Sequence, residues 1–169
     1  MEVYNSPHYS YSWIVDPLDS TTNFILKSGQ FTVNIALLHR SRPVFGVVHV
    51  PAQGKVYWAI KGRGAWVRDS IGQQRRLQCA EFSFDEPGLV VVAEGAAHVY
   101  PRLAPSYEWD TAAAQLIVEE AGGAVLEGHA GWNTSTEWLQ EAVQRRVPLV
   151  YNKESQRNPH FLVLGRLRT

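Results

Sequence analysis

The sequence predicts an α/β or α+β chain of layered strands and helices, with all 169 residues in a single domain. Two observations carry this prediction. Short strand-like runs separated by Gly-containing turns fill the first half, and a clear helix lies among further strands in the second half. We expect two sub-lobes, at 13–80 and 88–164, that share a core.

The first half predicts an antiparallel meander, because strand formers alternate with polar or glycine-containing turns. We expect its first strand to end at Pro17, since proline fixes φ and removes a backbone donor. Gly62 and Gly64 are interpreted as a hairpin turn and not as a phosphate loop. The expected strands are 13–15, 31–38, 43–50, 55–60 and 65–67.

The second half mixes both element types. A helix is expected over 108–123, with Asp110 and Thr111 at its start and two glycines at its end. A second helix is expected over 134–146, where apolar residues fall on one face. The expected strands are 88–95, 124–128, 147–152 and 161–165.

Composition narrows the class of protein. Lys plus Arg equals Asp plus Glu at 16 each, so no net positive charge favours a nucleic-acid polymer as partner. The single cysteine, Cys79, allows no intrachain disulfide. The chain starts without a signal-peptide pattern and contains no apolar run long enough to span a bilayer. We therefore expect a cytoplasmic protein without membrane insertion.

The stretch WIVDPLDSTTNF, at 13–24, is the first candidate site. A rigid turn at Pro17 can aim the carboxylates of Asp16 and Asp19 and the Leu18 carbonyl at one point. Oxygen ligands of this kind suit Mg²⁺ or another hard cation. The residues that follow could present backbone N–H groups to an anion. The alternative is an ordinary strand-to-helix turn with Asp19 or Ser20 as the N-cap.

Asp110 is the second candidate. It lies at the start of the helix expected over 108–123, directly after Trp109. It could serve as a further metal ligand brought to the first pair by the fold. An N-cap role would explain it equally well.

These motifs point to a known family. WIVDPLDSTTNF and WDTAAAQLIVEEAGG together resemble the two signatures of the inositol monophosphatase superfamily, which are Mg²⁺-dependent, lithium-sensitive phosphatases with a layered α/β/α/β/α sandwich. The stretches GQFTVNIALL, AEGAAHVYPR and YNKESQRNP are similar to the 3'(2'),5'-bisphosphate nucleotidase branch. The match runs in family order from Trp13 to about Leu164. It implies hydrolysis of the 3'-phosphate of adenosine 3',5'-bisphosphate to AMP by metal-activated water.

The resemblance also implies a metal site. Asp16 would bridge two metal ions and take part in catalysis, while the Leu18 carbonyl would complete the shell of one ion. Asp19 and Asp110 would bind the second ion. The family uses two or more Mg²⁺ ions.

The resemblance further implies the substrate contacts. Ser20 and Thr21 would offer backbone N–H groups to the phosphate, and the Thr21 hydroxyl would help to position the attacking water. Tyr100 and Arg102 would lie near the nucleotide, with Arg102 holding a second phosphate. A surface ion pair is the alternative role for Arg102. Lys153 would face the substrate, or else be an ordinary exposed lysine.

The sequence departs from the family pattern in three places. Only twelve residues precede the first signature, so the N-terminal helices of the family have no counterpart here. In the family these helices carry a metal-binding glutamate and an aspartate that pairs with the motif threonine. We therefore expect fewer metal ions to bind. A helix and a strand before AEG are also missing, because 88–102 joins two strand-like stretches directly. Finally, Ser20 replaces the usual glycine, at a cost on the order of a kcal/mol if the position needs positive φ.

Two alternatives to an active bisphosphate nucleotidase remain open at this point. The first is a shortened relative with impaired catalysis. The second is a phosphatase for inositol phosphate or a sugar phosphate. A homodimer is also expected, since a chain without the N-terminal helices has apolar surface to cover.

Overall fold

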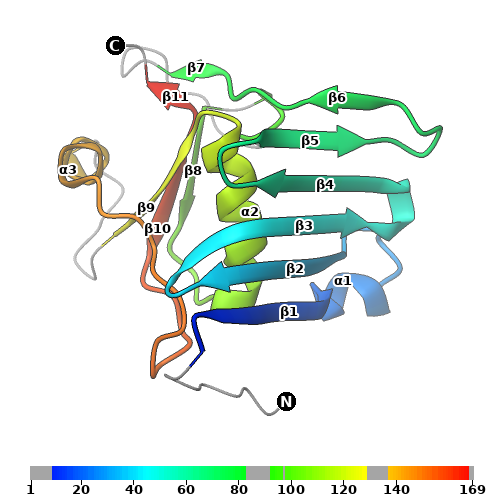
Figure 1. The fold of residues 1–169 in the computed structure, drawn as a ribbon, viewed down its shortest axis with the longest axis horizontal. Helices are drawn as coiled ribbons and strands as arrows, with labels where there is room; N and C mark the ends of the chain where they lie inside the picture. Colours follow the sequence, from blue (N-terminus) through cyan, green and yellow to red (C-terminus); the bar gives the residue numbers. More distant parts are fainter. Residues whose placement is uncertain (1–8, 83–91, 97, 129–136, 168–169) are drawn as a thin grey trace.

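The computed structural model describes residues 9–82, 92–96, 98–128 and 137–167 (Figure 1). The strands are β1 (Tyr11–Asp19), β2 (Thr32–His39), β3 (Arg42–Val50), β4 (Lys55–Ile60), β5 (Gly64–Arg68), β6 (Gln74–Arg76), β7 (Glu81–Phe82), β8 (Val99–Arg102), β9 (Ala124–Glu127), β10 (Phe161–Leu164) and β11 (Arg166–Leu167). The helices are α1 (Thr21–Ile25), α2 (Glu108–Glu120) and α3 (Glu137–Arg145), with a 3-10 turn at Pro51–Gln53.

The first half forms the expected meander. Strands β1 to β6 make one six-stranded sheet in sequence order, and every neighbouring pair is antiparallel. Gly62, and Gly64 at the first position of β5, belong to the expected hairpin turn between β4 and β5. Their N–H groups are already occupied, since Gly62 and Gly64 donate to the carboxylate of Glu120 at 2.7 and 2.8 Å. The carboxylate of Glu120 thus lies where a bound anion would lie in a phosphate loop.

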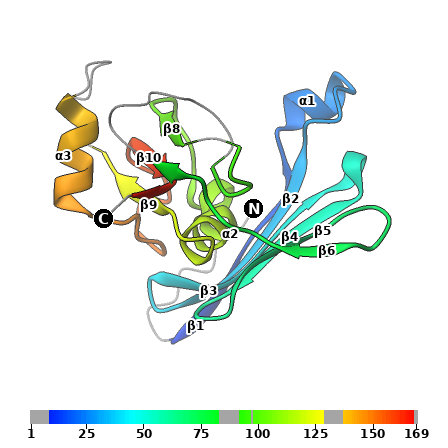
Figure 2. The ribbon, with the colours of Figure 1, turned by 90° about the horizontal axis from the view of Figure 1, so that it is seen from above.

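The elements stack in layers, as Figure 2 shows. Helix α2 lies between the six-stranded sheet and a three-stranded sheet of order β8-β10-β9, and α3 lies on the far side of the smaller sheet. Strand β10 serves both layers, because side chains alternate along a strand. Phe161 and Val163 pack into the core around α2, whereas Leu162 and Leu164 pack with Ala142 of α3. The predicted layered α/β class is confirmed.

Helix α2 approaches the large sheet closely. A Cβ atom built on Gly46 of β3 would lie 2.7 Å from the carbonyl oxygen of Ala113 in α2. The neighbouring sheet residues Ala36, Ala59 and Ala65 are small and fully buried. This close packing fixes where the first turn of α2, and therefore Asp110, lies relative to β1.

The opposite face of the large sheet carries exposed apolar side chains. Along β1, Ile14 packs into the core, whereas Tyr11 and Trp13 remain 57% and 61% exposed. The Trp13 ring meets Phe45 of β3 edge-on. No helix in the described ranges is long and apolar enough to cross a membrane.

Two sequence-based expectations are wrong. Strand β1 does not end at Pro17 but continues to Asp19. Proline is tolerated there because β1 is an edge strand with a neighbour on one side only. The strand expected over 147–152 is reduced to a single bridge between Leu126 and Pro148, and proline cannot donate to a longer ladder.

The strand expected over 88–95 falls largely outside the described residues. Its described end, from Val92 to Gly95, is a turn. The carboxylate of Glu94 holds this turn against the large sheet. It accepts hydrogen bonds from the Tyr57 hydroxyl at 2.9 Å and from Arg75 at 3.2 Å.

We predict that Gly46→Val destabilises the fold by about 2 kcal/mol, because the new side chain collides with the backbone of α2. Urea unfolding measures the change. Arg68→Val, at an exposed strand position of the same sheet, is the matched control and should have little effect. Equal midpoints for both variants would contradict the close packing of α2.

Candidate active site

A β-bulge places the first two carboxylates. Asp16 lies opposite Asn34 of β2 and Asp19 lies opposite Thr32, so three steps along β1 match two steps along β2. Residues three apart on a regular strand point to opposite faces. The extra residue changes this and brings both carboxylates to the face that meets α2.

The third carboxylate comes from α2. Asp110 is the third residue of the helix, and its carboxylate accepts the backbone N–H of Tyr107 at 2.8 Å. Asp110 is therefore not the N-cap but bonds back to the N-cap residue. The fully buried Glu108 secures the same turn, because it accepts the Asn152 N–H at 2.7 Å and the Lys153 ammonium at 2.6 Å.

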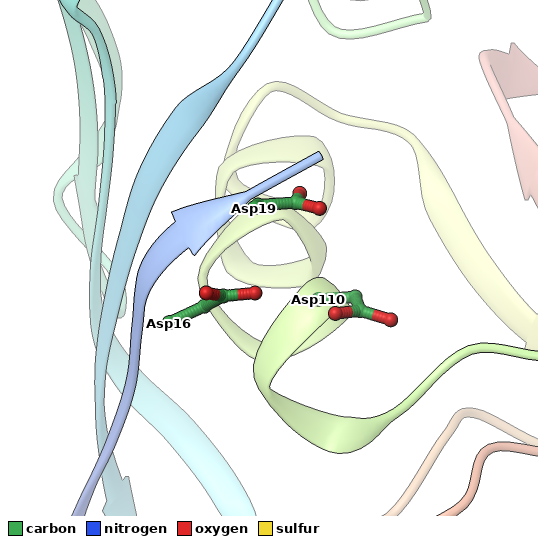
Figure 3. Close-up of side chains that lie close together, drawn as sticks. All are labelled: Asp16, Asp19 and Asp110. Atoms are coloured by element: carbon green, nitrogen blue, oxygen red, sulfur yellow. The ribbon is translucent and has the colours of Figure 1, made fainter. Parts of the chain in front are cut away.

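Asp16, Asp19 and Asp110 converge on one point (Figure 3). One oxygen from each lies within 4.8 Å of the others. Two oxygen ligands on opposite sides of Mg²⁺ are about 4.2 Å apart, so closure needs only small side-chain movements. The Leu18 carbonyl, which accepts the Thr21 hydroxyl at 3.3 Å, lies in the bulge between the two strand aspartates. The all-oxygen donor set fits a hard divalent cation.

The charges in the cluster repel one another. Burial raises the pKa of Asp16, the Leu18 N–H opposes this shift, and the charge of Asp19 adds to it. Burial likewise raises the pKa of Asp110, and the hydrogen bond from the Tyr107 N–H lowers it. The charges of Asp19 and Asp16 add to the rise, whereas the charge of Arg102 opposes it. Clustered carboxylates without a cation thus hold protons more tightly than isolated ones.

A cavity of about 330 Å³ adjoins the cluster. Strand β8 contributes Tyr100 and Arg102, which point the same way, and Arg102 donates to the Tyr100 hydroxyl at 3.3 Å. The cavity is lined by Asp19, Ser20, Tyr100, Arg102, Ser106, Asp110, Thr111, Ala114, Gln115, Val118, Val125 and Phe161. Two carboxylates and a guanidinium therefore face one small space.

The structure places Lys153 elsewhere. It lines a separate hollow with Glu127 and Arg157, and its ammonium pairs with Glu108. Its predicted contact with substrate therefore has no support from the geometry. Thr21 is the exposed first residue of α1. Its hydroxyl donates a hydrogen bond to the Leu18 carbonyl, and this bond keeps it near the carboxylate cluster.

Ser20 occupies a left-handed conformation, with φ 65° and ψ 54°. The sequence left open whether this position needs positive φ, and the structure shows that it does. Serine is strained there, whereas glycine is not. Ser20 thus carries a local strain at the edge of the cavity.

Sequence reasoning missed Thr32 and Asn34. Asn34 is only 4% exposed, and its amide donates to Asp19 at 3.1 Å. Two polar residues at alternate positions of an otherwise apolar strand were the available signal. They share a face with the buried Ala36 and Leu38, so they had to point toward the core.

Fold and site together define a layered α/β domain with a carboxylate cluster of the cation-binding type beside a small-molecule cavity. The model of the inositol monophosphatase family matches residues 2–86 and 85–158. The chain belongs to the inositol monophosphatase family.

Three known proteins are similar to this chain over most of its length. The 3'(2'),5'-bisphosphate nucleotidase CysQ of Salmonella typhimurium is 35% identical over 151 residues, covering 70% of this chain and 59% of its own. The protein of the same name from Haemophilus influenzae is 29% identical over 188 residues, covering 90% and 64%. The crystal structure of CysQ from Bacteroides thetaiotaomicron superposes with a TM-score of 0.73 at 32% identity, covering 96% of this chain and 72% of that one.

The chain spans about three fifths of the length of the two nucleotidases, at 59% and 64%. The family model matches in two segments that meet at residues 85 and 86. The alignment with the Haemophilus protein runs over 188 positions, more than the 169 residues of this chain. That relative therefore has residues without a counterpart here, in agreement with the expected internal shortening.

We predict that Ser20→Gly stabilises the protein by about 1 kcal/mol, because glycine adopts the left-handed conformation without strain. Thermal and urea unfolding measure the gain. Ser70→Gly is the matched control, since this exposed turn serine lies outside the left-handed region and should lose stability. A loss of stability in Ser20→Gly as well would contradict the strain.

We also predict a pH effect in the absence of divalent cations. A carboxyl with a raised pKa stabilises the fold below its unfolded pKa, 3.8 for aspartate, and this contribution is lost as the pH rises through the raised value. Asp16→Asn removes one charge but keeps an acceptor for the Leu18 N–H. In EDTA, the free energy of unfolding of this variant should therefore fall less between pH 4 and pH 7 than that of the wild type.

Urea unfolding at several pH values measures this difference. Asp69→Asn is the matched control, because Asp69 lies in a turn between β5 and β6 and also accepts backbone N–H groups. A pH profile of Asp16→Asn that parallels the wild type would contradict the raised pKa of Asp16.

Proposed function

We propose that this chain is a Mg²⁺-dependent phosphomonoesterase that removes the 3'-phosphate of adenosine 3',5'-bisphosphate to give AMP. The observation that carries the proposal is the shared cavity, in which the carboxylate cluster lies beside Tyr100 and Arg102. The names of the nucleotidases that this chain resembles support the substrate. A cavity of about 330 Å³ suits a small molecule and not a polymer.

In this proposal, Asp16, Asp19 and Asp110 hold Mg²⁺ together with the Leu18 carbonyl. Bound Mg²⁺ supplies neutralisation of the phosphoryl charge and a more acidic water. By the resemblance to the family, Asp16 would be shared between two ions.

The remaining residues orient the substrate. Ser20 and Thr21 offer backbone N–H groups to the reacting phosphate, and the Thr21 hydroxyl orients the attacking water. Arg102 holds the second phosphate through a two-pronged hydrogen bond. Tyr100, whose hydroxyl accepts a bond from Arg102, stands beside the nucleoside.

Two further expectations belong to the proposal. A cytoplasmic setting is consistent with a single, buried cysteine. A homodimer stays a prediction, for which the exposed Tyr11 and Trp13 on the outer face of the large sheet supply apolar surface.

The test is phosphate release from adenosine 3',5'-bisphosphate with and without Mg²⁺. We expect Mg²⁺-dependent release that falls at least about 100-fold in Asp19→Asn and Asp110→Asn, since each loses a charged ligand. Asp69→Asn, remote from the cluster, should retain full release.

The other possible outcomes of this assay would change the substrate, the activity or the site that we propose. Release from inositol 1-phosphate or a sugar phosphate, and not from the nucleotide, would replace the substrate but keep the site. A folded protein without release from any of these esters would identify a relative with impaired catalysis. Equal turnover in Asp19→Asn, Asp110→Asn and the wild type would contradict the assigned site.

A further inference from the structure

We infer that Asn34 and Thr32 of β2 form a positioning relay that presents one chosen oxygen of Asp19 to the cation. The inference rests on the proposed function, because it concerns how the same carboxylate cluster is held. Neither residue is one of the cluster's carboxylates, and both act through Asp19.

The contacts form a chain between the edge strand β1 and its neighbour β2. Asn34 donates from Nδ2 to Oδ2 of Asp19 at 3.1 Å. The Thr32 hydroxyl lies 3.0 Å from Oδ1 of Asn34 and 3.4 Å from Oδ2 of Asp19. The bulge in β1 creates this geometry, because it pairs Asp19 with Thr32 and Asp16 with Asn34.

The single hydroxyl proton decides the direction of the relay. Thr32 has one proton to donate, and the shorter contact is to Asn34 Oδ1. The Asp19 carboxylate can only accept, so the Thr32 bond and the Asp19 bond together set which way the Asn34 amide faces. A flipped amide would set its oxygen against the Asp19 carboxylate, where two acceptors repel. Thr32 thus holds Asn34 as a donor toward Asp19.

This arrangement has a consequence for the cluster. With the Asn34 amide bonded to Oδ2, Oδ1 is the oxygen of Asp19 that is more available to a cation. Asn34 is 4% exposed, so water cannot readily replace its amide. An amide is also neutral and adds no charge to a site where three carboxylates already repel one another.

The test measures Mg²⁺ binding by calorimetry in the absence of substrate. Removing a hydrogen-bond partner of a metal ligand typically weakens the metal about 10- to 100-fold, so we expect Asn34→Leu to weaken Mg²⁺ by this factor. Thr32→Val should weaken Mg²⁺ by a smaller factor, since the amide keeps its place but loses its fixed orientation. Thr32→Ser retains the hydroxyl and should bind Mg²⁺ within about twofold of the wild type.

Matched variants separate positioning from a merely structural role. Tyr57→Phe removes a hydrogen bond elsewhere on the same sheet, to Glu94, and should leave the Mg²⁺ affinity unchanged while lowering stability. If Asn34→Leu does not fold, the pair Thr32→Val and Thr32→Ser still decides the question, because Thr32 is only half-buried.

The outcomes distinguish this inference from the proposed function. If folded Asn34→Leu binds Mg²⁺ as tightly as the wild type, the relay is overturned and the proposed function still stands. If Asn34→Leu does not fold, wild-type affinity in Thr32→Val has the same meaning. A wild-type protein that binds no Mg²⁺ would overturn both. Weak binding in Asn34→Leu and Thr32→Val, with normal binding in Thr32→Ser, is the result that supports the relay.

Discussion

The whole site depends on one extra residue in β1. A regular strand would send Asp16 and Asp19 to opposite faces, and one of them would point away from α2. The bulge, which contains Pro17 and Leu18, turns both toward the helix that carries Asp110. Its place at the sheet edge makes it tolerable, because an edge strand has hydrogen bonds to one neighbour only. The chemistry of the site thus begins with a local irregularity of the backbone.

The rest of the fold holds this arrangement against its own repulsion. Small residues under α2, above all Gly46, let the helix come close enough for Asp110 to reach the cluster. Backbone N–H groups of Leu18 and Tyr107 and the amide of Asn34 each take one carboxylate oxygen. Without a cation, burial raises the pKa of Asp16 and of Asp110, and the charge of Asp19 adds to both rises. A divalent ion would relieve the repulsion, which couples cation binding to stability.

Much of this could be predicted from the sequence. Apolar runs bounded by turns identify the meander, and the two sequence motifs identify Asp16, Asp19 and Asp110 as candidate ligands. Their convergence could not be derived from strand periodicity, because alternation alone separates Asp16 from Asp19. The role of Asn34 depends on the register between β1 and β2, which the sequence does not contain. The substrate contact of Lys153 stays a prediction, because the structure shows only that its ammonium pairs with the buried Glu108.

The most direct test of the account is a crystal structure of the protein soaked with Mn²⁺, which scatters anomalously and takes the same oxygen ligands as Mg²⁺. The account predicts an anomalous peak bound by oxygens of Asp16, Asp19 and Asp110. Asp19 should contribute Oδ1, with Oδ2 still bonded to Asn34. A peak away from these carboxylates, or none in the cluster, would contradict the claim that the bulge and α2 together build a cation site.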